Sequence, residues 1–407
     1  ITYYSMFVIL YIYMQKSFFL FVISAIYILF LVSCSKDEII IYELTQEQKN
    51  VLNSIPQPSI IAHRGTCYLA PEETEAAMRW ARNAGATYLE CDLQRTKDGY
   101  LVLFHDLRLT RTSDIALKYP ERKNVAISDL TLEELFKLDM GSWFNYTYPS
   151  NARSSFSKLD ILTLEDVIMI AEGYRIQRDT FQKRIYKKIN ERVVTLYEPD
   201  PADNGNRPGI YTETKEPDLY PGIEQDLKKE LERLGWYADN ISNLKPIKTT
   251  PGGIYIANTP ARVVVQTFSQ ASLKKLRQSF SRLIPMCYLV GIATKENINK
   301  ETYEKWINFA IEQGAVIIGP SIYEKDGLLG DLLKPWMHDL IKEKGLLIHA
   351  YTFKNREQII NYFDMADGFF TNKADDLLSF LLKSGKQPLN HSNDYIDGFH
   401  ILDALGY

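Results

Sequence analysis

Short apolar runs alternate with amphipathic stretches between residues 59 and 384. The amphipathic stretches have helical spacing, and Ile223, Leu227, Leu231 and Leu234 fall on one such stripe. Strands are predicted at Ser59–His63, Thr87–Leu93, Leu101–His105, Ile210–Lys215, Arg262–Phe268, Ile284–Leu289, Ala315–Gly319, Leu346–Tyr351 and Gly368–Thr371. Because most of these runs are almost continuously apolar, the pattern predicts a parallel α/β sheet that is covered on both faces.

About eight strand–helix units that close on themselves form a (β/α)₈ TIM barrel, whose usual length is ~250 residues plus insertions. The predicted strands exceed that number by one. Thr87–Leu93 and Leu101–His105 are therefore expected to pair as a hairpin across Lys97-Asp98-Gly99, an Asp-Gly turn signal. A doubly wound sheet is the alternative, but the sequence has no glycine-rich nucleotide-binding loop, which favours the barrel.

The N-terminal region resembles a secretory signal. Residues 17–32 form an uninterrupted apolar run, which Lys16 precedes and Cys34 closely follows. A cysteine at that place resembles a bacterial lipobox. Residues 1–34 are therefore predicted to be a lipoprotein signal with Cys34 as the lipidated residue.

Two further points concern this region. A transmembrane anchor needs about 20 apolar residues, and residues 6–33 reach that length only across the polar pair Gln15-Lys16. Met14 is a candidate start, which would leave residues 1–13 untranslated. We predict a cell-envelope lipoprotein of the outer membrane, at its periplasmic face or on the cell surface.

Composition divides the rest of the chain. Residues 35–58 are predicted to be a polar tether, 59–384 the barrel domain and 385–407 a tail. Two segments are typical of insertions: 107–160, with a short helix near its middle, and 174–208, whose end is a loop by composition. Long loops inside a compact barrel are commonly functional.

Net charge and cysteine usage oppose a nucleic-acid partner and a disulfide framework, respectively. The formal net charge of −4 gives no basic field, so nucleic acid is not an expected partner. With Cys34 lipidated, Cys67, Cys91 and Cys287 remain, an odd number without zinc-type spacing. A disulfide framework is therefore not predicted.

Carboxylates concentrate at two predicted strands. Glu90 and Asp92 alternate onto one strand face, where their mutual repulsion would be relieved by a hard divalent cation such as calcium or magnesium. The alternative is that both simply face solvent. Glu213 could supply a third ligand and Lys215 a charge for a phosphate oxygen, although the two could equally form an intrastrand salt bridge.

Two histidines each end a predicted strand beside these acids. His63 and His105 could deliver and remove protons in one displacement, because the ordinary pKa of histidine lies near neutrality. Arg64 could hold a phosphate through its guanidinium fork. A single histidine would more often be structural, but a pair in this setting favours catalysis. The segment around Tyr351 is interpreted as pocket wall.

Taken together, these motifs resemble the glycerophosphodiester phosphodiesterase family, in particular its periplasmic bacterial branch. The resemblance extends over most of the chain. It rests on His63-Arg64-Gly65, Pro71-Glu72-Glu73-Thr74, Tyr88-Leu89-Glu90-Cys91-Asp92, Thr96-Lys97-Asp98-Gly99-Tyr100-Leu101-Val102, His105-Asp106, Glu213-x-Lys215 and Asp367-Gly368-Phe369-Phe370-Thr371. Several ordered motifs are a more specific signal than any one of them.

The resemblance implies a TIM barrel that cleaves glycerophosphodiesters to glycerol 3-phosphate and an alcohol. A divalent metal takes part, most often Ca²⁺, with Mg²⁺ as the other candidate. The implied metal ligands are Glu90, Asp92 and Glu213, the implied acid–base pair is His63 and His105, and the implied phosphate-binding residues are Arg64 and Lys215.

Two positions depart from the family's pattern. Glu73 stands where the family usually has Asn or His, which would add negative charge near the metal. Phe353 stands where many members carry Trp, and with Tyr351 it is expected to contact the substrate.

Metal-dependent hydrolysis of glycerophosphodiesters is the predicted function. One alternative is a phospholipase D-like phosphodiesterase that acts on lysophospholipid or sphingomyelin, which apolar side chains from residues 107–160 lining an acyl groove would favour. The other is a surface lipoprotein that binds phosphodiesters without turnover, but the retained proton-transfer groups oppose it.

Overall fold

The computed structural model describes residues 42–407, apart from 252, 294–297, 326 and 387–396. The predicted signal segment and Cys34 therefore lie outside the described residues. Within the described part of the chain, no helix has the length and apolarity that crossing a membrane requires.

A closed barrel of parallel strands is the centre of the fold. In the described chain its order is β1–β2–β8–β9–β10–β11–β12–β13, and β13 pairs with β1 to close the ring. The strands are β1 Ser59–Ala62, β2 Tyr88–Arg95, β8 Gly209–Thr214, β9 Val263–Thr267, β10 Met286–Val290, β11 Ile317–Pro320, β12 Leu347–Phe353 and β13 Gly368–Thr371. The predicted TIM barrel is thus confirmed.

The ninth predicted strand is β3, Leu101–Leu103, which pairs antiparallel with β2. The turn between them contains Gly99, whose φ of 87° lies in the left-handed region that glycine adopts without strain. The predicted hairpin is therefore confirmed.

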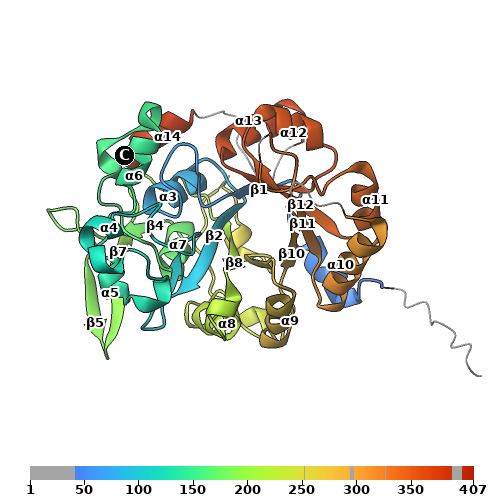
Figure 1. Cartoon of the computed structure of the whole chain (residues 1–407), viewed down its shortest axis with the longest axis horizontal. Coiled ribbons are helices and arrows are strands. Elements are labelled where there is room, and N and C mark those ends of the chain that lie inside the picture. Colours follow the sequence, from blue (N-terminus) through green and yellow to red (C-terminus); the bar gives the residue numbers. More distant parts are fainter. Residues whose placement is uncertain (1–41, 252, 294–297, 326, 387–396) are drawn as a thin grey trace, which may run out of the picture. The chain divides into compact units, whose positions relative to one another are not determined.

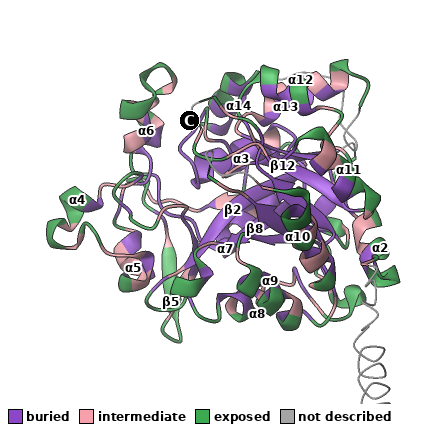
Figure 2. Ribbon diagram, turned by 45° about the vertical axis from the view of Figure 1, so that its right-hand side comes forward, coloured by how far each residue is buried: buried purple, intermediate pink, exposed green. Residues whose placement is uncertain are grey.

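Helices connect the strands and pack on the outside of the barrel, while the strands themselves are buried (Figures 1 and 2). They are α3 Glu75–Asn83, α7 Leu164–Ala171, α8 Ile223–Arg233, α9 Gln270–Ser279, α10 Lys300–Glu312, α11 Pro335–Glu343, α12 Arg356–Tyr362 and α13 Ala374–Lys383. Side chains of α8 follow the predicted stripe, because Ile223, Leu227 and Leu231 are buried.

Both ends of the described chain pack on the barrel. Helix α2, Gln46–Asn53, lies within the predicted tether, yet Val51 and Leu52 pack against the barrel's interior core, and the side chain of Gln48 donates to the carbonyl of Ile311. Helix α14, Gly398–Leu405, lies within the predicted tail, and Trp80 of α3 donates to the carbonyl of Gly398. The predicted tether and the predicted tail each contain apolar residues that pack on the barrel, so neither segment is only a polar extension.

The two inserted segments are more structured than their composition indicates. Residues 107–160 contain α4 Ile115–Lys118, α5 Leu132–Leu135, α6 Ser142–Thr147 and several 3₁₀ turns. Residues 174–208 contain the antiparallel pairs β4 Tyr174–Ile176 with β7 Tyr197–Pro199 and β5 Tyr186–Ile189 with β6 Arg192–Thr195. Val102, Leu109, Leu135 and Val193 belong to one small core of their own, beside β2 (Figure 1).

Candidate metal and acid–base site

A pocket of about 680 Å³ opens at the carboxyl-terminal ends of the barrel strands. That end is where TIM barrels carry their active sites. Its lining includes nearly all residues that the sequence singles out, namely His63, Arg64, Glu90, Asp92, His105, Glu213, Lys215 and Tyr351. The fold therefore brings together residues that lie more than a hundred positions apart.

Three buried carboxylates form the floor of one side of the pocket. Glu90, Asp92 and Glu213 each offer an oxygen within 4.8 Å of the others. Strand pairing fixes this arrangement, because Asp92 of β2 lies directly opposite Glu213 of β8. Oxygen atoms at this spacing suit a hard divalent cation.

The acids interact too strongly for all of them to stay ionised without such a cation. Burial and the neighbouring Asp92 raise the pKa of Glu90 well above its usual range. Burial also raises the pKa of Glu213 to about 8. Burial opposes the charge of Asp92 as well, but Lys215, His105 and Arg64 hold its pKa below the usual range. The fixed negative charge of the site is thus centred on Asp92.

Several buried polar atoms of the site have no hydrogen-bond partner among the described residues. Glu73 Oε2 and Gln266 Oε1 are acceptors of this kind. Asp92 Oδ2 and Arg64 Nε make no hydrogen bond either, but they form an ion pair with each other at 3.3 Å. Unsatisfied buried acceptors beside carboxylates suit a cation, and the Arg64 guanidinium in the same pocket suits an anion. The residues present therefore fit a divalent metal together with a phosphate group.

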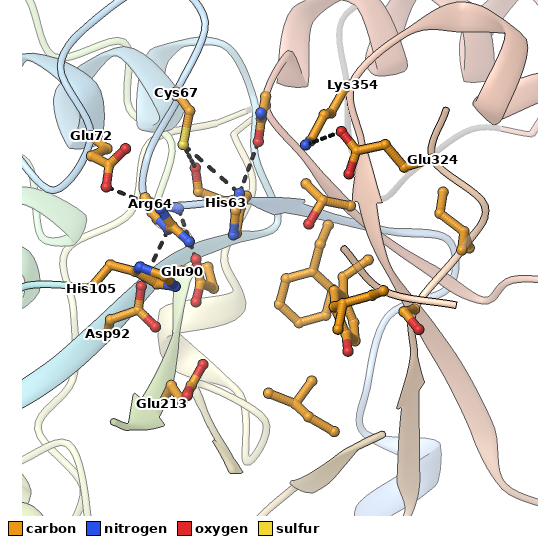
Figure 3. A pocket seen from close by; sticks show the side chains of 18 of the residues that line it. His63, Arg64, Cys67, Glu72, Glu90, Asp92, His105, Glu213, Glu324 and Lys354 are labelled. Atoms are coloured by element: carbon orange, nitrogen blue, oxygen red, sulfur yellow. Dashed lines mark hydrogen bonds and ion pairs between the residues drawn. The ribbon is translucent and has the colours of Figure 1, made fainter. Parts of the chain in front are cut away.

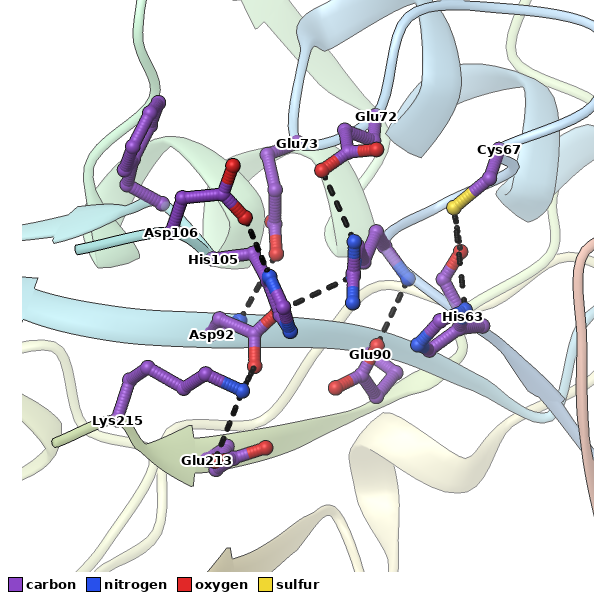
Figure 4. A network of polar contacts seen from close by, with 12 residues as sticks. His63, Cys67, Glu72, Glu73, Glu90, Asp92, His105, Asp106, Glu213 and Lys215 are labelled. Carbon is purple, nitrogen blue, oxygen red and sulfur yellow. Dashed lines mark hydrogen bonds and ion pairs between the residues drawn. The ribbon is translucent and has the colours of Figure 1, made fainter. Parts of the chain in front are cut away.

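Two basic side chains, Lys215 and Arg64, border the carboxylates (Figures 3 and 4). Lys215 Nζ lies 3.5 Å from Asp92 Oδ1 and 3.3 Å from Glu213 Oε1. Arg64 Nη1 donates to Glu72 Oε1 at 3.0 Å, and its backbone N–H donates to Glu90 Oε2 at 2.7 Å. The salt bridge that the sequence offered as an alternative for Lys215 is thus present within the same pocket, where it does not exclude a phosphate-binding role.

His63 is half-buried and has a neutral partner. Its Nδ1 lies 2.8 Å from Asn372 Oδ1, an oxygen that can only accept, so Nδ1 carries the hydrogen and Nε2 holds the free lone pair. Burial, helped by the charge of Arg64, lowers the pKa of His63 to about 3. The imidazole is consequently neutral at physiological pH.

His105 has a charged partner instead. Its Nδ1 lies 2.7 Å from Asp106 Oδ1, and Arg111 donates to the same carboxylate and to Glu72. Burial works against the charge of Asp106, but hydrogen bonds from His105 and Arg111 keep its pKa below the usual range. An ionised Asp106 therefore faces His105, which is half-exposed to the pocket.

Glu73, which departs from the pattern of the family that the sequence resembles, contacts Asp92. Its Oε1 accepts from the backbone N–H of Asp92 at 2.9 Å, and its backbone adopts a left-handed φ of 59°. Burial and the nearby Asp92 raise its pKa well above the usual range. Glu73 therefore supports β2 at the point where that strand presents Asp92.

The opposite side of the pocket carries one ion pair and is otherwise largely apolar. Glu324 and Lys354 form an ion pair there, across the pocket from Asp92 and Glu213 (Figure 3). Apolar side chains complete that wall, namely Phe268, Leu289, Ile322, Leu328, Leu329, Tyr351 and Phe370. Of residues 107–160, Tyr148 contributes to the lining.

The structure corrects one predicted site residue. Phe353 is fully buried, and its ring packs against those of Tyr362 and Phe369. Strand β12 has a register irregularity between Ala350 and Phe353, so the regular alternation of side chains is interrupted there. Phe353 is a core residue and does not line the pocket.

A substitution at Phe353 is therefore expected to change stability and not substrate affinity. Phe353→Ala should lower the free energy of unfolding by about 3–5 kcal/mol, because it leaves a cavity in a packed core. Phe353→Leu should keep KM within twofold of the wild type. Urea unfolding and steady-state kinetics measure the two effects, and a large rise in KM with unchanged stability would contradict this assignment.

Among the pocket residues that the sequence analysis missed are four with polar or charged side chains: Gln266, Glu324, Lys354 and Asn372. Asn372 directly follows a predicted strand, and Gln266 is a polar residue inside an otherwise apolar one, so both carried a usable signal. Glu324 and Lys354 lie in or beside loops, where no periodicity indicates which way a side chain points.

Comparisons with known proteins agree with this architecture. Residues 63–240 match the model of the "Glycerophosphoryl diester phosphodiesterase family". A glycerophosphodiester phosphodiesterase of Bacillus subtilis is 28% identical over 351 residues, which are 85% of this chain and 94% of the relative.

Solved structures show the same fold at low identity. A putative glycerophosphoryl diester phosphodiesterase from Silicibacter pomeroyi aligns with a TM-score of 0.57 at 16% identity, over 84% of this chain and 99% of that one. A phosphodiesterase from Oleispira antarctica, in complex with the product sn-glycerol-3-phosphate, aligns with a TM-score of 0.51 at 19% identity, over 79% of this chain and 96% of that one.

The TIM barrel carries two histidines and a carboxylate triad at its carboxyl-terminal end. Together with these matches, this site identifies the protein as a phosphoric diester hydrolase. More narrowly, the chain is similar to the glycerophosphodiester phosphodiesterase family, whose model it matches over residues 63–240.

Proposed function

We propose that the protein hydrolyses glycerophosphodiesters to glycerol 3-phosphate and an alcohol, with His63 and His105 as its acid–base pair. One observation carries the proposal: two histidines with unlike partners enter the same pocket as a carboxylate triad and two basic side chains. The matched family and the Bacillus subtilis relative are named for glycerophosphodiester cleavage, and the Oleispira antarctica structure holds sn-glycerol-3-phosphate; both facts support this choice of substrate.

Glu90, Asp92 and Glu213 would hold the metal, for which we propose Ca²⁺, with Mg²⁺ as the other candidate. When bound, a divalent cation supplies positive charge for the phosphoryl oxygens and for the oxygen that attacks phosphorus. Carboxylate-only coordination favours these hard cations over softer transition metals.

His63 is the proposed general base. The hydrogen bond from its Nδ1 to Asn372 fixes the tautomer, and the free lone pair on Nε2 can then take a proton from the water that attacks phosphorus. Because the ring is neutral at physiological pH, it is ready to accept a proton at the start of the reaction.

His105 is the proposed general acid. The Asp106 carboxylate accepts from Nδ1–H and provides the negative charge that a protonated imidazole requires beside it. Nε2–H can then protonate the alcohol oxygen as it leaves phosphorus. Arg111 holds Asp106 in place, so the pair keeps its orientation.

Arg64 and Lys215 stabilise the charge that develops on the phosphoryl oxygens. The Arg64 guanidinium, which pairs with Asp92 and Glu72, is available to one oxygen, and Lys215, which lies between Asp92 and Glu213, is available to another. Both cations are already in position before the substrate binds, so little reorganisation is needed.

The alternative activity on lysophospholipid or sphingomyelin receives less support. It would be favoured by an acyl groove lined from residues 107–160, and that segment contributes Tyr148 to the described lining. Binding without turnover is opposed by the two oriented histidines, because a binding protein has no use for them.

Release of glycerol 3-phosphate is the direct test. The purified protein is expected to release it from glycerophosphocholine and glycerophosphoethanolamine with added Ca²⁺ or Mg²⁺, and to lose this activity in excess chelator. Re-addition of the metal should restore the activity, which serves as the control for damage to the protein. Absence of product with either metal would contradict the proposed function.

We also propose that a lipid on Cys34 anchors the enzyme to the outer membrane. The apolar run before that cysteine supports this placement. Metabolic labelling with a radioactive fatty acid, compared between the wild type and Cys34→Ala, tests it.

A further inference from the structure

We infer that Gln266 is a fourth protein ligand of the metal, with its side-chain carbonyl oxygen Oε1 as the ligand atom. This inference rests on the metal site of the proposed function. It adds an uncharged amide oxygen to the triad of Glu90, Asp92 and Glu213.

Strand register places Gln266 beside the triad. On three neighbouring strands, Asp92 lies opposite Glu213 and Glu213 lies opposite Gln266, so the three side chains form one row across the barrel. Gln266 is 1% exposed and lines the same pocket as the carboxylates.

Contacts with Glu90 orient the Gln266 amide. Gln266 Nε2 donates to Glu90 Oε1 at 2.8 Å, while the backbone N–H of Arg64 donates to Glu90 Oε2 at 2.7 Å. Both oxygens of Glu90 thus accept from N–H groups. The donor end of the amide is held by Glu90, which leaves the carbonyl end free.

The carbonyl end has no partner in the described part of the protein. Gln266 Oε1 is buried and accepts no hydrogen bond. Buried acceptors are nearly always satisfied in folded proteins, and a bound ion is one of the few agents that can satisfy several at once.

The chemistry of the four groups indicates which cation they suit. Calcium accepts six to eight oxygen ligands and commonly uses side-chain amide carbonyls, whereas magnesium keeps several waters and takes fewer protein ligands. A fourth protein oxygen therefore favours Ca²⁺ over Mg²⁺. We expect loss of the Gln266 carbonyl to weaken Ca²⁺ binding more than Mg²⁺ binding.

Two substitutions distinguish a ligand from a residue that only orients Glu90. Gln266→Met removes both the carbonyl and the N–H groups, and should weaken Ca²⁺ binding at least about tenfold. Gln266→Glu keeps an oxygen in place of the carbonyl but removes the donor to Glu90. If Gln266 is a ligand, this variant should bind Ca²⁺ as tightly as the wild type or more tightly.

Binding is measured by isothermal titration with CaCl₂ and with MgCl₂, independently of catalysis. Terbium(III) luminescence lifetimes in H₂O and D₂O give a second measurement, because they count the waters on the bound ion. Gln266→Met should add about one water, and Gln266→Glu should add none. Gln48→Met is the matched control, since Gln48 is a buried glutamine of α2 that bonds to Ile311 near the start of the strands.

The outcomes separate this inference from the proposed function. Ca²⁺ affinity of Gln266→Met within twofold of the wild type would overturn the inference alone. Equal losses in Gln266→Met and Gln266→Glu would also overturn it, because they would assign Gln266 to the orientation of Glu90. If the wild type bound neither cation, the proposed metal site itself would be refuted. The proposed hydrolysis is judged separately, by release of glycerol 3-phosphate. Circular dichroism of each variant in chelator verifies folding.

Discussion

Replacing His105 by alanine is expected to lower kcat for glycerophosphocholine by about 10²–10⁴-fold, the range that positioned general acids contribute. Choline leaves as a basic alkoxide unless it is protonated, so it depends on the acid. In a glycerophosphodiester whose alcohol is p-nitrophenol, the leaving group departs as a stable phenolate and needs no such proton. On that substrate the His105→Ala variant should retain most of the wild-type kcat.

The partner histidine provides the contrast. His63→Ala should lose activity on both substrates to a similar extent, because the attacking water must be deprotonated whichever group leaves. Asn372→Asp would give His63 a charged partner and should move the acidic limb of the pH–rate profile to higher pH. His338→Ala on α11 is the control histidine. Equal losses on both substrates for His105→Ala would contradict its assignment as the acid.

Glu213→Gln is expected to affect stability and function in opposite directions. In the metal-free protein at pH 8 it should raise the free energy of unfolding by about 2–4 kcal/mol, because the elevated pKa of Glu213 opposes folding at that pH. The same variant should weaken metal binding at least about 100-fold, since it removes a ligand that carries charge. Hydrolysis should fall accordingly.

The direction of the pH effect follows from proton binding. The pKa of Glu213 is raised from 4.5 in the unfolded chain to about 8 in the folded protein, so folding takes up a proton between these values. Stability is therefore present at low pH and is lost as the pH rises from 4.5 to 8. Glu73 and Glu90 have raised pKa values too and act in the same direction.

Urea unfolding in chelator at pH 5 and pH 8 measures this effect. The wild type should be less stable at pH 8 than at pH 5, and Glu213→Gln should reduce that difference. Saturating Ca²⁺ should stabilise the wild type at pH 8 and leave the variant nearly unchanged. A wild type equally stable at both pH values without metal would contradict the electrostatic account of the triad.

Periodicity was sufficient to predict the barrel but not its insertions. Buried parallel strands such as Ile210–Lys215 read as apolar runs, and the Asp-Gly turn at Gly99 distinguished the one antiparallel strand from the barrel strands. Residues 174–208 have no comparable pattern, because their hairpins pack on a small local core and are largely exposed. Their strands depend on contacts with distant residues, which a local pattern cannot report.

Site residues were predictable where they end regular strands. Glu90, Asp92 and Glu213 alternate correctly because β2 and β8 are regular and pair without interruption. The prediction that Phe353 contacts the substrate was wrong because β12 is irregular before this residue, so two-residue alternation no longer tells which side a residue faces. The partners of the histidines were harder still: Asp106 is adjacent to His105, but Asn372 reaches His63 from the other end of the sequence.

The pairing of Asp92 with Glu213 has a consequence for how the barrel tolerates change. β2 and β8 are neighbours in the sheet, yet both inserted segments lie between them in the sequence. The entropy lost when such a loop closes grows only with the logarithm of its length, by about 0.6 kcal/mol for each doubling. Trimming or extending the surface hairpins should thus hardly alter how often the two strands meet. The inserted segments can therefore change in length while Asp92 and Glu213 keep their register across the two strands.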